Sequence, residues 1–250
     1  MSGHSKWSKI KRKKGATDAK RSKMWARTTR DIMVAAREGG GNPGMNPRLA
    51  LAIEKGKSEN LPKDNIERAI KRGTGEIESA DYEEVNYEGY APHGIAMFVE
   101  TLTDNTNRTV ADLRSIFSKA GGNLGNAGSV AFLFDQKGVF EIPAEGQSED
   151  DLFMLVADAG GEDLRQEDES FVVETPVDAF GAVQAALQEV GVEPEEAGLQ
   201  RIPNTSTKLD SEATAKILAL IDTLDDHQDV QAVYSTLELD EETLAAMVDG

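Results

Sequence analysis

The fold is decided by the stretch at residues 138–202, which reads GVFEIPAEGQSEDDLFMLVADAGGEDLRQEDESFVVETPVDAFGAVQAALQEVGVEPEEAGLQRI. Short runs rich in Val, Ile and Phe, typical of strands, alternate in it with apolar residues at helical spacing. Its elements are predicted as strands at 138–142, 163–167, 170–174 and 196–202, with helices opening at Ser148 and at Thr175-Pro176. The order β-α-β-β-α-β is the split βαβ order of a ferredoxin-like unit.

The second helix of this unit has apolar side chains at nearly ideal helical spacing. We expect its buried face to consist of Phe180, Val183, Leu187 and Val190. Gly191 should end the helix, because glycine adopts the left-handed conformation found at helix ends at little cost.

The elements on either side of this unit predict a second α/β domain. They are strands at 83–89, 95–102 and 129–134, a helix at 107–120, a helix at 211–224, a strand at 229–236 and a tail helix at 240–249. The elements before residue 135 lack a last helix and strand, which residues 211–236 would supply. We therefore expect residues 136–204 to be one domain inserted into another, formed by 78–135 and 205–250.

The N-terminal part predicts three short helices. The first begins at Thr17 or Asp18 and ends at glycines 39–41, the second begins after the Asn46 cap, and the third follows Pro62. Residues 1–16 show no apolar periodicity and are predicted to be a flexible arm. The expected fold class is thus α+β: a helical domain at 1–77 followed by two α/β domains, at least one ferredoxin-like, with the third inserted into the second.

Charge is distributed very unevenly along the 250 residues. The net charge of -18 combines a basic N-terminal part with an acidic remainder. Residues 1–77 hold 19 Lys and Arg against 8 Asp and Glu, whereas the rest holds 8 against 37. Such a basic arm on an acidic body indicates a polyanionic partner, and nucleic acid is the first candidate.

The basic residues closest to the N-terminus are the candidate nucleic-acid-binding residues. Cations neutralise phosphates and release counterions, and aromatic rings stack on unpaired bases. Trp7 lies outside any core pattern and suits stacking, whereas Trp25, at helical spacing, suits core packing equally well. A solvated helix face, or pairing with the acidic body, is the alternative interpretation. The candidates are Lys6, Trp7, Lys9, Lys11, Arg12, Lys13, Lys14, Lys20, Arg21, Lys23, Arg27 and Arg30.

Several classes of function lose support from composition alone. The chain has no cysteine, which excludes disulfides, thiolate metal sites and cysteine nucleophiles. Its three histidines lack the i,i+4 spacing of a metal site. No run of 18 apolar residues predicts a membrane helix, and the basic N-terminus leads into no apolar segment of a signal peptide.

The sequence also contains no recognisable motif for catalysis or for cofactor binding. Residues 222–229 gather four carboxylates and a histidine but lack the spacing and glycine of a calcium loop, so a polar helix end is the preferred interpretation. No nucleophile–base set is visible. We expect no catalytic residues, no metal, no cofactor and no small-molecule substrate. No dimer zipper is visible either, and we expect a monomer.

Ten short strings spread along the chain form a recognisable set. They are MSGHSKW at 1–7, KRKK at 11–14, DAKR at 18–21, GGG at 39–41 with Asn46-Pro47, YEGY at 87–90, DN at 104–105, NRT at 107–109, GGNLG at 121–125, GSV at 128–130 and Ile221-Asp222. The opening heptad and the block at 104–130 are the most specific of them. Together the strings resemble the YebC/PmpR family of bacterial regulatory proteins.

The resemblance implies a three-domain cytoplasmic regulator of gene expression without enzymatic activity. The family is customarily described as DNA-binding transcriptional regulators, and it includes the mitochondrial translational activator of cytochrome c oxidase subunit one. It is also associated with translation, including help for ribosomes slowed at proline-rich stretches.

Three hypotheses remain open. The favoured one is a translation factor that binds RNA or the ribosome through the basic arm, because flexible lysines with interspersed aromatics suit RNA. The second is a DNA-binding transcriptional regulator, against which no helix with a base-reading set of Arg, Asn and Gln can be placed. The third is a ligand-sensing or enzymatic α/β protein.

Overall fold

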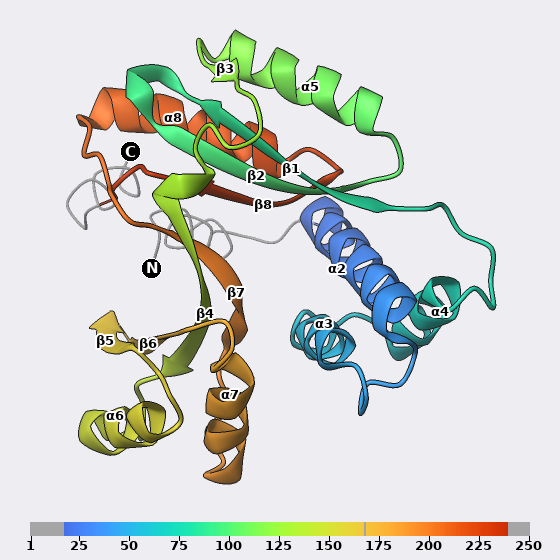
Figure 1. Cartoon of the computed structure of the whole chain (residues 1–250), viewed down its shortest axis with the longest axis vertical. Coiled ribbons are helices and arrows are strands. Elements are labelled where there is room, and N and C mark those ends of the chain that lie inside the picture. Colours follow the sequence, from blue (N-terminus) through green and yellow to red (C-terminus); the bar gives the residue numbers. More distant parts are fainter. Residues whose placement is uncertain (1–17, 168, 240–250) are drawn as a thin grey trace. The chain divides into compact units, whose positions relative to one another are not determined.

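The computed structural model describes residues 18–167 and 169–239 (Figure 1). A three-helix region at the N-terminal end precedes two four-stranded antiparallel sheets, each with two helices. The predicted α+β class is therefore confirmed. The predicted tail helix at 240–249 lies outside the described residues.

The N-terminal helices are α2 (Asp18–Gly39), α3 (Pro47–Ser58) and α4 (Lys63–Gly73). Asn46 joins two of them. Its side chain accepts a hydrogen bond from the Leu49 N–H at 3.0 Å and donates to the Ala35 carbonyl at 2.7 Å. It therefore caps α3 and also satisfies a carbonyl near the end of α2. Gly39 is required beside it, since a Cβ there would lie 2.5 Å from the Asn46 amide nitrogen.

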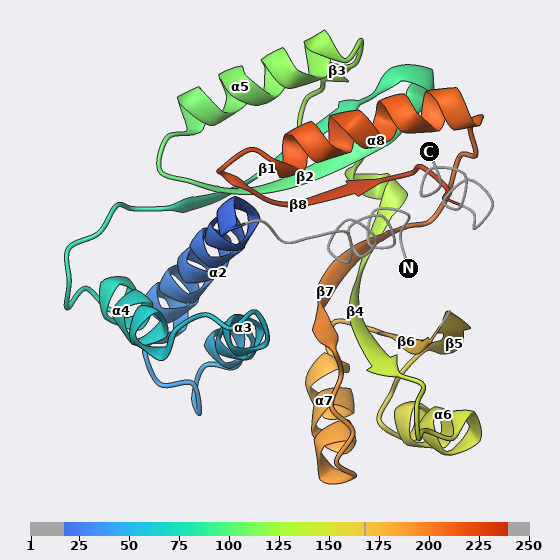
Figure 2. The same cartoon turned by 180° about the vertical axis from the view of Figure 1, so that it is seen from behind.

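The first sheet has the strand order β3-β1-β2-β8. Two helices cover one of its faces (Figures 1 and 2), and buried side chains of both pack with those of β2 and β8 in one core. The elements are β1 (Glu83–Tyr90), β2 (Ala96–Thr103), α5 (Thr106–Lys119), β3 (Asn123–Leu124), α8 (Ser211–Asp225) and β8 (Val230–Ser235).

The strand predicted at 129–134 does not form, and this prediction was wrong. The segment instead enters the 3-10 turn η2 (Ala131–Leu133), and Phe132 is 68% exposed. The cause is Glu88 of β1, whose buried carboxylate accepts the N–H groups of Gly128, Val130 and Ala131 at 2.6–2.8 Å. Backbone donors held in this way are not available to a strand ladder.

The second sheet belongs to a compact unit spanning Phe134–Ile202. Its strand order is β5-β6-β4-β7, and the predicted order of its six elements is confirmed. They are β4 (Phe134–Pro143), α6 (Glu149–Asp158), β5 (Asp163–Glu167), β6 (Ser170–Thr175), α7 (Phe180–Glu189) and β7 (Glu196–Pro203).

The core of this unit follows the predicted helix face with one exception. The rings of Phe140 and Phe180 stack at a centroid distance of 4.5 Å, and Val183 and Leu187 are fully buried beside them. Val190, predicted to share this face, is 57% exposed. It occupies the C-cap of α7, where the chain has already left the helical path, so helical spacing no longer sets its direction.

Candidate nucleic-acid interface

Helix α2 separates a buried apolar face from a basic one. Thr28, Ile32 and Ala35 are buried at helical spacing and pack the helix against α3 and α4. Lys23, Arg27 and Arg30 recur at i, i+4 and i+7, so they share another face of the helix. Three of the candidate cations are therefore brought into one row.

This basic row meets an acidic turn, residues 225–228, which begins with the last residue of α8. The Lys23 Nζ lies 2.9 Å from Asp226 Oδ1, and the Arg27 Nη1 lies 3.3 Å from Asp225 Oδ1. Arg27 also donates to the Asp225 carbonyl. Its side chain is only 17% exposed, so the pair with Asp225 is partly shielded from solvent and from salt. These two cations thus fit the alternative interpretation, pairing with the acidic body.

Arg30, the third cation of the row, is fixed by different groups. It donates a hydrogen bond to the Gln228 carbonyl, and its guanidinium carbon lies 5.9 Å from the centre of the Tyr82 ring. That distance is within the range of a cation–π contact. Arg37, two turns further along α2, donates to the Tyr82 carbonyl and so helps to hold this tyrosine beside the helix.

The two tryptophans can now be distinguished in part. Trp25 is half-buried and packs against the core of the three helices, and its Nε1 donates to the Glu59 carbonyl at 3.0 Å. An indole held by its ring and by its N–H is a structural group and not a free stacking platform. Of the two interpretations left open for Trp25, core packing is the one its surroundings support.

The other candidates divide by position. Arg21 is exposed on the first turns of α2, and Lys20 lies on the same helix. Seven candidates lie outside the described residues, namely Lys6, Trp7, Lys9, Lys11, Arg12, Lys13 and Lys14.

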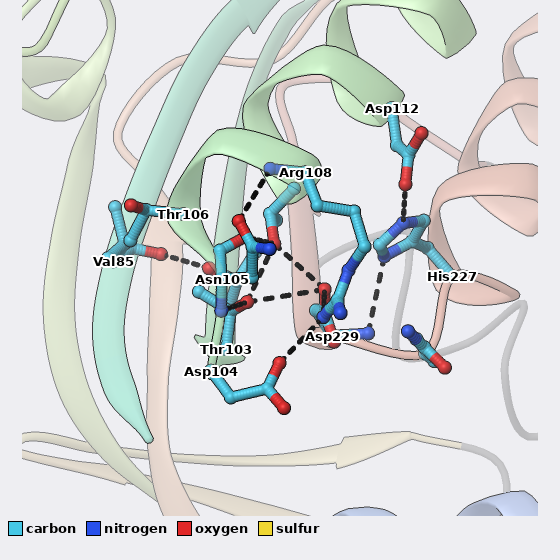
Figure 3. Close-up of polar contacts among 12 residues, drawn as sticks. Val85, Thr103, Asp104, Asn105, Thr106, Arg108, Asp112, His227 and Asp229 are labelled. Carbon is cyan, nitrogen blue, oxygen red and sulfur yellow. Dashed lines mark hydrogen bonds and ion pairs between the residues drawn. The ribbon is translucent and has the colours of Figure 1, made fainter. Parts of the chain in front are cut away.

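A polar cluster around Asp229 holds the C-terminal end of the acidic turn (Figure 3). Asp229, whose side chain is 2% exposed, accepts hydrogen bonds at Oδ2 from Thr109 at 2.8 Å and Thr103 at 3.3 Å. The Arg108 guanidinium lies 2.9 Å from the same oxygen and 2.9 Å from Asp104. Asp229 therefore links the end of β2 and the start of α5 to the start of β8.

Asp229 is held in its ionised form. Burial by itself would raise its pKa, but the hydrogen bonds from Arg108 and Thr109 and the positive charge of Arg108 outweigh burial, so the pKa of this carboxyl lies below its ordinary value. The Asp229 Oδ2, which faces three protein donors, has little capacity left for a further partner.

His227 connects this cluster to α5. Its Nδ1 accepts the Asp229 N–H at 3.2 Å, which places the ring proton on Nε2, 3.3 Å from Asp112 Oδ2. Asn105 caps α5 by accepting the Arg108 N–H at 3.0 Å. The acidic turn is thus supported by α5 and β8 while its carboxylates contact α2.

Sequence reasoning did not assign these polar groups a shared role. The strings at 104–105 and 107–109 contributed only to the resemblance, and residue 229 belonged to a stretch judged on calcium-loop spacing. The sequence signal for this cluster was the Asn105 helix cap, which lies between Thr103 and Thr109, the two threonines that bond Asp229.

Within residues 18–167 and 169–239 no group of three or more acidic or histidine side chains is arranged to hold a metal ion. The same ranges contain no helix with the length and apolar character to span a membrane.

Comparison with known proteins covers nearly the whole chain. Residues 5–76 match the model of the TACO1/YebC protein N-terminal domain, and residues 82–237 match that of the TACO1/YebC second and third domain. A probable transcriptional regulatory protein of Chlorobaculum tepidum is 50% identical over 248 residues, which is 99% of both chains. One of the same description from Rubrobacter xylanophilus is 51% identical over 246 residues, 98% of each.

A solved structure shares the fold. The crystal structure of a conserved hypothetical protein from Aquifex aeolicus matches with a TM-score of 0.82 and 42% sequence identity. The match spans 90% of this chain and 93% of the Aquifex protein. The sequence relatives are named as regulators and not as enzymes. With both family models and full-length relatives at about half identity in agreement, the chain belongs to the TACO1/YebC family.

Proposed function

We propose that this protein is a non-enzymatic, nucleic-acid-binding regulator of gene expression that acts on RNA or the ribosome as a translation factor. Its role would be to relieve slow translation, for example at proline-rich stretches. The observation that carries the proposal is the segregation of charge. Residues 1–30 hold 11 basic side chains against a single acidic one, on a chain of net charge -18.

The basic row of α2 gives this charge a rigid base. Helix α2 is packed against α3 and α4, so cations on its other face are held in a fixed line. The predicted arm at 1–16 precedes this helix directly and would extend the line along a polyanion. Fixed cations set the orientation of a bound strand, and additional cations raise affinity through counterion release.

The acidic turn competes with nucleic acid for the same cations. Asp225 and Asp226 present carboxylate oxygens to Arg27 and Lys23, much as phosphate oxygens would. Binding of a strand along α2 must displace these contacts or leave them in place and use the remaining cations. In either case the affinity for a polyanion depends on the turn as well as on the arm.

RNA is favoured over duplex DNA on chemical grounds. Of the seven candidates at residues 6–14, five are lysines, which bind phosphate as flexible point charges without fixing a base. Readout of an operator needs bidentate contacts to base edges in the major groove. Trp7 adds a stacking group that unpaired bases can use and stacked duplex bases cannot.

A DNA-binding transcriptional regulator is the second candidate. The printed names of the relatives, probable transcriptional regulatory proteins, favour it. Both candidates use the same basic surface and differ in the structure of the nucleic acid they recognise.

The finer domain division is also part of the proposal. We assign a helical domain to 1–77, an α/β domain to 78–135 plus 205–250, and an inserted ferredoxin-like domain to 136–204. The strand order β5-β6-β4-β7, with both crossovers made by helices, supports the last assignment.

Crosslinking in living cells followed by sequencing of the bound nucleic acid tests the function. The full-length protein is compared with a variant in which Lys11, Arg12, Lys13 and Lys14 are changed to glutamate. We expect recovery of ribosomal or messenger RNA with the unchanged protein and its loss with the variant. Recovery of one or a few chromosomal DNA sites instead would replace the translation factor by the transcriptional regulator.

A further inference from the structure

An open groove of about 420 Å³ lies beside the basic row of α2, between that helix, the end of α4 and the segment leading into β1. Its volume falls within the range of roughly 300–1,000 Å³ found for small-ligand pockets. Polar side chains dominate its lining, namely Thr29, Arg30, Arg72, Glu78, Ser79 and Tyr82.

Arg30 and Tyr82 line this groove together and are within cation–π distance of each other. The guanidinium lies 5.9 Å from the ring centre, and its hydrogen bond to the Gln228 carbonyl keeps it from rotating freely. The Arg30 Nε is buried without a hydrogen-bond acceptor among the described residues. A guanidinium plane that is held in place beside an aromatic ring offers a stacking surface for a nucleobase.

Arg72 supplies a second cation to the groove. Its side chain is exposed in the last turn of α4, and within residues 18–167 and 169–239 its guanidinium makes no hydrogen bond or ion pair. Its position near a helix C-terminus favours a positive charge for the stability of α4 alone. That effect does not require the side chain to line a groove together with a second arginine and a tyrosine.

We propose that this groove binds one nucleotide of an unpaired strand, with the base stacked on Arg30 and the adjacent phosphate paired with Arg72. The inference rests on the proposed function and deepens it by naming a site on the folded helices. A duplex cannot use the site, because its bases are already stacked and paired. Glu78 repels a bare anion and accepts hydrogen bonds from base amino groups, so inorganic phosphate alone should not bind.

The test uses the full-length protein and a fluorescein-labelled single-stranded RNA of ten nucleotides, with anisotropy measured at several salt concentrations. Arg72→Gln should weaken binding and lower the slope of log affinity against log salt by about 0.7, the value for one phosphate contact on a single strand. The control is Arg114→Gln, which removes the same charge from an exposed position on α5, and it should leave the slope unchanged.

Arg30→Lys separates stacking from charge. It keeps the positive charge but removes the flat surface, and we expect affinity for the RNA to fall about five- to a hundredfold, the equivalent of losing one stacked base. The melting temperature of each variant is compared with that of the unchanged protein. As a second readout, RNA containing 4-thiouridine should crosslink to the segment that carries Tyr82, and Arg72→Gln should reduce that crosslink.

The outcomes separate the groove from the general function. If the unchanged protein binds the RNA and both variants bind it equally well, the groove is not a nucleotide site, while the proposed function stands. If the unchanged protein binds neither this RNA nor a DNA strand of the same sequence, both proposals are overturned. Equal binding of inorganic phosphate and RNA in the groove would make it an anion site and overturn the nucleotide assignment.

Discussion

Arg27 of α2 contacts Asp225, at the end of α8, twice: through its carboxylate, at 3.3 Å, and through its backbone carbonyl. The two residues are 198 positions apart in the sequence. A cation expected to bind nucleic acid is thus already partnered by a carboxylate of the same chain. At the acidic turn, carboxylates of the acidic part of the chain therefore pair with cations of α2.

Weakening that contact should raise affinity for nucleic acid. In Asp225→Asn and Asp226→Asn proteins, we expect RNA to bind more tightly by about 0.2–1 kcal/mol per substitution, the range measured for exposed to partly exposed ion pairs. Asp150→Asn, at an exposed position on α6, makes the same change in net charge and should have a smaller effect. Equal gains for all three would show that only net charge matters.

The arm should supply most of the electrostatic affinity. Changing Lys11, Arg12, Lys13 and Lys14 to glutamate should abolish binding at physiological salt without lowering the melting temperature, since the segment has no core periodicity. Each lost phosphate contact should lower the salt slope by about 0.7–0.9. A variant with arginine at the three lysine positions keeps the charge and should bind normally. An unchanged slope in the glutamate variant would contradict the proposal.

The two tryptophans should respond oppositely to the same substitution. Trp7→Ala should weaken RNA binding by about 1–3 kcal/mol, the range for one stacked base, and leave the stability of the fold unchanged. Trp25→Ala should instead lower the free energy of unfolding by about 2–4 kcal/mol, because it removes a half-buried ring and its bond to Glu59. Urea unfolding and anisotropy together make the comparison. A stable Trp25→Ala protein that has lost RNA binding would reverse the two roles.

Helices and strands could largely be predicted from the sequence. The Asn46 cap, the glycines at 39–41 and the helical spacing of Phe180, Val183 and Leu187 act locally, so a single sequence contains them. The strand predicted at 129–134 failed because Glu88, some forty residues earlier, takes up its backbone donors. Nothing in the local pattern indicates that contact.

The basic residues of the candidate site could be predicted from the sequence, but the acidic residues that they contact could not. The cations of α2 were visible as a charge excess, and pairing with the acidic body was one of two alternatives. That Arg27 meets Asp225, or that Asp229 is bonded to Arg108, depends on how the first sheet brings α8 and β8 beside α5. Such long-range partners follow from topology and not from spacing.

Asp229 should make the stability of the first sheet depend on acid pH. The pKa of Asp229 is lower in the folded protein than in the unfolded chain. Its contribution to the free energy of unfolding is therefore fully present above the unfolded-state pKa of about 3.9, and it is lost as the pH falls through the folded-state pKa. Asp229→Asn should cost about 2–3 kcal/mol at pH 7, by leaving Arg108 and two threonines poorly paired. The difference from the unchanged protein should shrink below pH 4 in urea unfolding series. A difference that stays constant from pH 7 to pH 3 would contradict the assigned ionisation.

The domain that we propose to be inserted, at 136–204, should fold by itself when it carries the whole of β4. Residues 134–203 contain all four strands and both helices of the second sheet, and Phe140, Phe180, Val183 and Leu187 form a buried core within that segment. Produced alone, the fragment should show a cooperative thermal melt by circular dichroism. The segment 78–135 should not, because it lacks α8 and β8, whose apolar side chains complete the core of the first sheet.

Two substitutions in the fragment test the core assignment. Phe180 is 5% exposed and stacks on Phe140, so Phe180→Ala should destabilise the fragment by about 3–5 kcal/mol. Val190 is 57% exposed at the C-cap of α7, and Val190→Ala should change stability by less than about 0.5 kcal/mol. Equal losses from the two would mean that the end of α7 packs inward after all. A fragment that stays unfolded while 78–135 folds cooperatively would refute the insertion, because the domain boundaries would then lie elsewhere.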